Sequence, residues 1–202
     1  MPCVVRERRV LTVRALALFF LVPLVVAHAG AATTVDAKTL VLQREDVPDG
    51  FQVDSRRSTY ISNAAFAAGN KAQQRLVLRT ERLDGYQRTF NQRVPSAINT
   101  VLSTSHLFRG SAGAHVLFAE ADAEQRALNA ARAKQGGRAF RVSRGVLGDD
   151  SSIYWSRSRP WYVLALWRTR RVVAVIGSWG VGRQKTVELA RLQQRRIDRA
   201  LN

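Results

Sequence analysis

The segment that decides the fold is residues 160–179, with the sequence PWYVLALWRTRRVVAVIGSW. It contains two runs, 160–168 and 172–179, that are almost continuously apolar and rich in Val, Ile, Trp and Tyr, residue types that favour β-strands. The pair Thr169-Arg170 between the runs predicts a tight hairpin turn. Strands that are apolar along nearly their whole length are typical of the centre of a sheet covered on both faces. The segment therefore predicts a central hairpin with helices on either side.

Several segments upstream of this hairpin have the composition of strands and turns. Residues 86–93 and 98–108 are expected to form a second hairpin, because the Pro95-Ser96 pair between them favours a turn. The remaining predicted strands and turns are residues 51–61, a segment beginning with Phe140 and Val142, the turn Gly148-Asp149-Asp150, and residues 152–157.

The clearest predicted helix follows Ser111, which is expected to be its N-cap, and ends at Gly136-Gly137. Its apolar stripe comprises Ala114, Leu117, Phe118, Ala121, Leu128 and Ala131, and its polar face Glu120, Asp122, Glu124 and Arg126. Other predicted helices span residues 35–41, residues 63–80 with Gly85 as the break, and residues 185–201. Groups of consecutive antiparallel strands with helices between them predict an α+β fold, in which a largely antiparallel sheet is flanked by helices on both faces.

The N-terminal segment has the pattern of a secretory signal peptide. Four arginines within the first fourteen residues precede an uncharged run of thirteen residues, ALALFFLVPLVVA. Ala29 and Ala31 supply the A-x-A pattern that signal peptidase accepts. The run contains Pro23 and is shorter than the about twenty apolar residues that a spanning helix needs. We expect residues 1–31 to be cleaved and residues 32–202 to form a single secreted or cell-envelope domain; an uncleaved membrane anchor is the alternative.

Cysteine content and net charge indicate which chemistry and which partners the mature domain is expected to have. The single cysteine, Cys3, lies in the predicted signal peptide, so the mature domain would contain neither disulfides nor thiol chemistry. The net charge is +17; removing residues 1–31, with four Arg and one Glu, leaves +14. Such a charge favours anionic partners. Because 28 of the 32 basic residues are Arg and they are scattered, GC-rich codon usage is an alternative explanation.

Four segments resemble a group of exported bacterial domains of uncharacterised function that is common in high-GC actinobacteria. They are LVLQREDVPDGF at 40–51, LGDDSSIY at 147–154, VLALWRTRRVVAVI at 163–176 and ELARLQQRRIDRAL at 188–201. The resemblance implies a PsbP-like α/β/α sandwich, the fold of LpqN-type exported lipoproteins and of the extracellular sensor domain of PknH-type kinases. LpqN-type proteins carry a lipobox cysteine and the PknH sensor has disulfides, and this domain departs from both. The motifs are structural, so they imply a fold and not an activity.

The candidate binding site is a cluster of aromatic and basic residues. All four tryptophans lie between residues 155 and 179, among several arginines. Trp161 and Trp167 are six residues apart, so on one regular strand they share a face. Indoles beside guanidinium groups are suited to hold an apolar or anionic ligand. The predicted ligand-binding residues are Trp155, Trp161, Trp167, Arg157 and Arg168. The alternative is that these rings pack beneath the helices as core.

Catalytic and metal-binding patterns are not evident. His106 and His115 lack further ligands at zinc-site spacing. The Asp149-Asp150 pair is interpreted as a turn, because a calcium loop needs more oxygen ligands in register. The sequence contains neither a Gly-x-Ser-x-Gly elbow nor a phosphate-binding glycine motif. We therefore expect no cofactor, no metal and no enzymatic activity.

Three functions stay open as hypotheses. The first is a non-enzymatic binding or sensor-like domain of the cell envelope, whose partner is a lipid, a cell-wall anion or an envelope protein. The second is a polyanion-binding or membrane-surface protein that acts through Arg191, Arg195, Arg196 and Arg199. The third is an envelope hydrolase with a Ser–His–Asp arrangement that only the fold could assemble. Export argues against genomic nucleic acid as a partner, and we expect a monomer.

Overall fold

The computed structural model describes residues 35–95, 97–158 and 161–202. The predicted signal peptide at residues 1–31 lies outside the described residues, as do Ser96 of the predicted turn and Pro160 at the start of the predicted central hairpin. None of the helices in the described part of the chain is long and apolar enough to cross a membrane.

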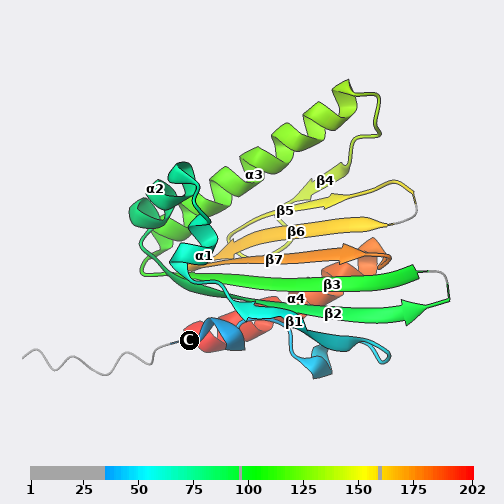
Figure 1. The fold of residues 1–202 in the computed structure, drawn as a ribbon, viewed down its shortest axis with the longest axis horizontal. Helices are drawn as coiled ribbons and strands as arrows, with labels where there is room; N and C mark the ends of the chain where they lie inside the picture. Colours follow the sequence, from blue (N-terminus) through cyan, green and yellow to red (C-terminus); the bar gives the residue numbers. More distant parts are fainter. Residues whose placement is uncertain (1–34, 96, 159–160) are drawn as a thin grey trace, which may run out of the picture. The chain divides into compact units, whose positions relative to one another are not determined.

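The strands of the described residues form one antiparallel sheet of seven, in the order β1-β2-β3-β7-β6-β5-β4 (Figure 1). The strands are β1 (Gln52–Tyr60), β2 (Arg82–Val94), β3 (Ala97–Phe108), β4 (Arg141–Arg144), β5 (Asp150–Trp155), β6 (Tyr162–Thr169) and β7 (Val172–Trp179). The predicted hairpins are β2–β3 and β6–β7, and the second lies inside the sheet, between β3 and β5. The predicted α+β class with a largely antiparallel sheet is confirmed.

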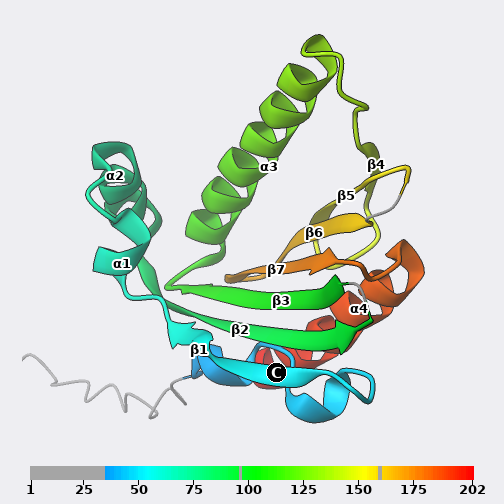
Figure 2. The same ribbon diagram turned by 45° about the vertical axis from the view of Figure 1, so that its right-hand side comes forward.

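Helices cover both faces of this sheet (Figures 1 and 2). Helix α4 lies on one face, together with two short 3₁₀ turns near the start of the domain, whereas α3 lies on the other face with α1 and α2 beside it. Their bounds are η1 (Ala37–Thr39), η2 (Arg44–Asp46), α1 (Asn63–Ala67), α2 (Lys71–Thr80), α3 (Ser111–Lys134) and α4 (Arg183–Leu201).

Strand alternation divides the core into two layers. On β6, Ala165 and Trp167 belong to the cluster that contains Leu189 of α4. Leu166, between them, belongs to the cluster that contains Leu117 of α3. This division explains why the central strands are apolar along nearly their whole length: each successive side chain is covered by a different helix.

Three predicted boundaries are wrong. The predicted helix 63–80 is interrupted, because Ala68 and Gly69 both have a positive φ, and α1 and α2 result. Gly85 does not break a helix but lies within β2, where a Cβ would come 2.7 Å from the carbonyl oxygen of Ser105. At the central hairpin, Thr169 pairs with Val172, so the two-residue turn lies one position later than predicted.

Helix α3 has the predicted extent but differs from the prediction in its cap and its faces. Gly110 is the N-cap, and Ser111 is the first helical residue. Asp122, predicted to face solvent, is buried, and Leu128, predicted to face the core, is 56% exposed. The C-terminal half of the helix rises away from the sheet (Figure 2), so the apolar residues of this half are not packed in the core.

Candidate functional site

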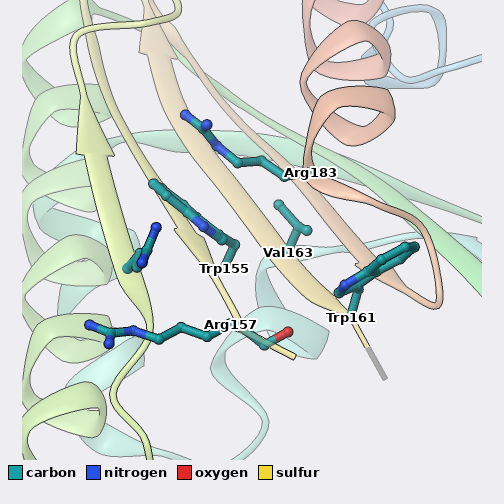
Figure 3. A pocket seen from close by; sticks show the side chains of 7 residues that line it. Trp155, Arg157, Trp161, Val163 and Arg183 are labelled. Carbon is teal, nitrogen blue, oxygen red and sulfur yellow. The ribbon is translucent and has the colours of Figure 1, made fainter. Parts of the chain in front are cut away.

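A cavity of about 230 Å³ lies at one end of the sheet, on the face that α4 covers (Figure 3). Two indoles and three guanidinium groups dominate its lining. The lining residues are Arg141, Trp155, Ser156, Arg157, Trp161, Val163 and Arg183. Three of the five predicted ligand-binding residues, Trp155, Trp161 and Arg157, therefore come together at one place.

Strand register builds the floor of this cavity. Arg141 of β4 pairs with Trp155 of β5, and Trp155 pairs with Val163 of β6. Residues paired in this way project from the same face of a sheet, so the three side chains form one row across neighbouring strands. Figure 3 shows Val163 between the two indoles. Sequence reasoning missed Arg141, because only the register of β4 against β5 brings it to Trp155.

The first turn of α4 supplies the opposite wall. The guanidinium carbon of Arg183 lies 4.1 Å from the centre of the Trp155 ring, which is the geometry of a cation–π contact. The ring of Trp161 lies beside Gly182, where a Cβ would meet it at 3.7 Å. The amide N–H of Gly180 donates to the carbonyl oxygen of Trp161 at 2.9 Å, which holds this residue against the loop before α4. Arg183 was also missed by sequence reasoning, since it is remote from Trp155 along the chain.

The charge of the cavity is uncompensated within the described part of the chain. Arg141, Arg157 and Arg183 form no ion pair with a described carboxylate, and the described lining contains no Asp, Glu or His. A guanidinium that stacks on a ring through its face keeps the N–H groups at its edge available for an oxyanion. The cavity is thus positively charged, with aromatic walls.

The other two predicted ligand-binding residues lie elsewhere. Trp167 is completely buried in the layer between the sheet and α4, so its ring is core. Arg168 projects from the opposite face of β6, and its guanidinium is held by Asp149 at 3.0 Å and Asp150 at 2.8 Å. Trp167 shares a face with Trp161 as expected, but α4 covers it. Arg168 is neutralised by the acidic pair Asp149 and Asp150 at the start of β5.

The same acidic turn accounts for Asp149 and Asp150. Asp149 also accepts a hydrogen bond from the backbone N–H of Arg170 at 2.7 Å, so these carboxylates fasten the β6–β7 turn. The hydrogen bond from Arg168 holds the pKa of the Asp150 carboxyl below its ordinary value, an effect that outweighs partial burial. Within the described residues no group of three or more His, Cys, Asp and Glu side chains is placed to hold a metal.

The two histidines of the described chain lie in different surroundings. His115 is on the first turn of α3, largely exposed, with its Nδ1 atom 3.6 Å from Asp150. His106 is buried on β3, on the face covered by α3, and contacts the guanidinium of Arg82. His106 lines a second, mostly apolar cavity of about 350 Å³ between α2, α3 and the sheet. Neither histidine is near the aromatic cavity.

The four arginines of the alternative surface lie on α4. Arg191, Arg195 and Arg199 are exposed, whereas Arg196 is about one-fifth exposed and bound to Glu45 and Asp46 of η2 at 2.7 and 2.6 Å. These two carboxylates raise the pKa of Arg196 above its ordinary value, despite the opposing effect of burial. Arg196 therefore joins the N-terminal segment of the domain to α4, and the free basic surface there consists of three residues.

Comparisons with known proteins yield one weak structural similarity. No family model matches the chain, and no curated protein matches it in sequence. The crystal structure of the extracellular domain of PknH from Mycobacterium tuberculosis aligns over 82% of this chain and 94% of that chain, with 12% sequence identity and a TM-score of 0.45. A likeness of this strength carries no argument about function.

Proposed function

We propose that the domain is a non-enzymatic binding module of the cell envelope, and that its aromatic cavity takes a small organic anion with an apolar or aromatic body. The observation that carries the proposal is the convergence of three arginines and two tryptophans on one cavity whose described lining has no carboxylate. An oxyanion gains charge-assisted hydrogen bonds from the guanidinium edges. The body of the ligand gains apolar contact with the indoles.

Two features support binding in place of catalysis. The described lining offers one hydroxyl, that of Ser156, and no imidazole or carboxylate that could activate it as a nucleophile. The exposed His115 and the half-buried Asp150 lie on the other face of the sheet, next to Arg168. The export signal predicted at residues 1–31 supports a place outside the cytoplasmic membrane, where the ligand would be an envelope or environmental molecule.

The test is a titration of the domain with phenyl phosphate, followed by tryptophan fluorescence and by calorimetry. Phenyl phosphate should bind more tightly than inorganic phosphate or phenol, since only it satisfies both the guanidinium and the indole groups. Arg141→Gln and Arg183→Gln should each weaken binding about tenfold or more, as expected for the loss of one charge-assisted contact. Arg191→Gln, an exposed arginine on α4, is the matched control and should leave the affinity unchanged.

Salt dependence separates this proposal from binding of a polyanion by the α4 surface. Affinity for a polyanion should collapse between roughly 50 and 200 mM salt, because many counterions are released. Affinity for a small anion in the cavity should fall only modestly over the same range. Equal affinities for phenyl phosphate in the Arg183→Gln, Arg141→Gln and Arg191→Gln variants would refute the proposed site.

A further inference from the structure

The structure has a concentration of exposed apolar side chains at the end of the domain where β2 turns into β3 and where β7 ends. Of the nine large hydrophobic residues that are exposed in the described chain, five lie here. We call this set the end surface; it consists of Val94, Ile98, Leu128, Val142 and Trp179. The hairpin of β2 and β3 and the end of β7 point toward the same side of the domain in both views, and the C-terminal end of α3 lies farther from the sheet (Figures 1 and 2).

Contacts between strands and rings connect these residues. Trp179 pairs with Thr100 on β3 and with Tyr162 on β6. The ring centres of Trp179 and Tyr162 are 5.1 Å apart, and those of Tyr162 and Phe140 are 5.3 Å apart. These three rings form a row at the end of the sheet. Leu128 and the same three rings line an open groove of about 600 Å³. Leu128 and Trp179 of the end surface thus border one groove, and Val94, Ile98 and Val142 lie on the β2–β3 hairpin and on β4.

Six arginines lie at this end of the domain, three of them on the β2–β3 hairpin or near the end of α3 and three on the opposite face of the sheet. Arg93 pairs with Ile98 on the β2–β3 hairpin, Arg132 stacks on the Phe140 ring at 4.9 Å, and the carbonyl of Arg138 accepts a hydrogen bond from Arg132. The other three are those of the aromatic cavity, Arg141, Arg157 and Arg183. Among the residues that the structure describes, none of these six is ion-paired with a carboxylate.

We infer that the end surface docks the domain on a bilayer of anionic lipid. Apolar side chains would enter the interface, tryptophan and tyrosine rings would lie at headgroup depth, and the arginines would meet lipid phosphates. The apolar side chains are on separate elements: the β2–β3 hairpin, α3, β4 and the end of β7. A fluid bilayer accepts such separate insertions, whereas a protein partner would need a rigid matching shape.

The test measures binding to vesicles made of phosphatidylglycerol and, in parallel, of phosphatidylcholine. The predicted mature chain, residues 32–202, should sediment with phosphatidylglycerol vesicles at low salt and much less with phosphatidylcholine vesicles. The double variant Ile98→Asn/Leu128→Asn should lower the partition coefficient about tenfold or more. Leu78→Asn is the matched control, because Leu78 is 79% exposed on α2 and lies outside the end surface, and it should bind as the unaltered domain does.

A second pair of variants tests the charge. Arg93→Gln/Arg138→Gln should reduce binding to phosphatidylglycerol about tenfold or more, since each arginine near an anionic surface contributes several-fold. Arg191→Gln/Arg195→Gln removes the same charge from exposed positions on α4 and should have a small effect. Thermal unfolding and circular dichroism establish that each variant is folded before its binding is compared.

Three outcomes would overturn the inference. They are absence of binding to phosphatidylglycerol vesicles at low salt, equal binding by the Ile98→Asn/Leu128→Asn and Leu78→Asn proteins, and a loss confined to the α4 variant. The last result would assign membrane binding to the alternative surface. Docking does not depend on the ligand of the aromatic cavity, because Ile98→Asn/Leu128→Asn should still bind phenyl phosphate. Failure of one proposal is therefore distinguishable from failure of the other.

Discussion

Arg82 and His106 are buried against each other on neighbouring strands, with the Nδ1 atom of His106 3.3 Å from Nε and 3.0 Å from Nη2 of Arg82. The guanidinium has only N–H donors, so Nδ1 must accept and the imidazole is neutral. Asn63 and the carbonyl of Ile61 accept further hydrogen bonds from Arg82 at 2.6 and 2.7 Å. Burial lowers the pKa of Arg82 to about 10, which leaves it charged at neutral pH.

This arrangement predicts that the domain loses stability in mild acid. Burial, and secondarily the charge of Arg82, lowers the pKa of His106 from its ordinary 6.5 to about 3. Between these values the unfolded chain binds a proton that the folded chain does not, so the free energy of unfolding falls as the pH falls through this window. The slope is at most about 1.4 kcal/mol per pH unit for one proton.

The measurement is urea unfolding at several pH values between roughly 4 and 7, with His106→Gln as the comparison. The free energy of unfolding of the variant should decline less steeply as the pH falls, with a difference in slope of up to the value for one proton, about 1.4 kcal/mol per pH unit. Asp84, whose pKa is raised by burial, titrates in both proteins and cancels from the difference between the slopes. Parallel curves for the two proteins would contradict the assignment of proton uptake to His106.

A second prediction concerns the hydrogen bond that joins α3 to β5. The hydroxyl of Tyr154 donates to Oδ1 of buried Asp122 at 2.6 Å. Tyr154→Phe removes this donor from a buried carboxylate and should lower the free energy of unfolding by about 2 kcal/mol. Tyr162→Phe is the control, because the hydroxyl of Tyr162 makes no hydrogen bond with a described residue, and it should cost under about 1 kcal/mol. Similar losses in both variants would show that the ring, and not the hydroxyl, carries the effect.

A third prediction concerns Gly113, where α3 comes close to the end of α2. It tests whether Gly113→Ala raises or lowers the stability of the domain. It lies in the first turn of α3, where a Cβ would come 1.9 Å from the carbonyl oxygen of Thr80 at the end of α2. Helix propensity alone would make Gly113→Ala stabilising by about 1 kcal/mol. The steric conflict between the two helices should instead make it destabilising by about 2 kcal/mol. A thermal midpoint at or above that of the unaltered domain would show that α2 and α3 can separate without loss.

A fourth prediction tests whether Trp167 belongs to the core or to the binding site. Its indole Nε1 is buried and has no hydrogen-bond partner among the described residues, so Trp167→Phe loses packing alone. We expect a destabilisation of about 1–2 kcal/mol and no change in affinity for phenyl phosphate. Trp155→Phe, in the lining of the cavity, should weaken that affinity. Weakened ligand binding in the Trp167→Phe protein would return this residue to the candidate site.

The sequence by itself was sufficient for the class of fold and for the main elements. Residues 163–167 and 172–176 are apolar on both faces of two strands, and only a position inside a sheet, beneath two helical layers, covers such side chains from water. The hairpins and the two long helices followed from local signals of this kind. The break between α1 and α2 was missed, although Gly69, which has a positive φ, and Asn70, the N-cap of α2, are sequence signals for it.

Sequence reasoning identified only part of the candidate site. Clustering of tryptophans and arginines in one stretch marked Trp155, Trp161 and Arg157, which the structure places in one cavity. The same pattern could not exclude Trp167, which α4 covers, or Arg168, which Asp149 and Asp150 neutralise. Nor could it add Arg141 and Arg183, which reach Trp155 through strand register and through the docking of α4.

The periodicity of apolar residues along the chain indicates which side chains are buried, and that was sufficient to predict a sheet with helices on both faces. Which charges are left without partners, and which apolar residues are left without cover, depends on contacts between residues distant in the sequence. Tertiary packing alone decided those two questions, and the cavity and the end surface both follow from their answers.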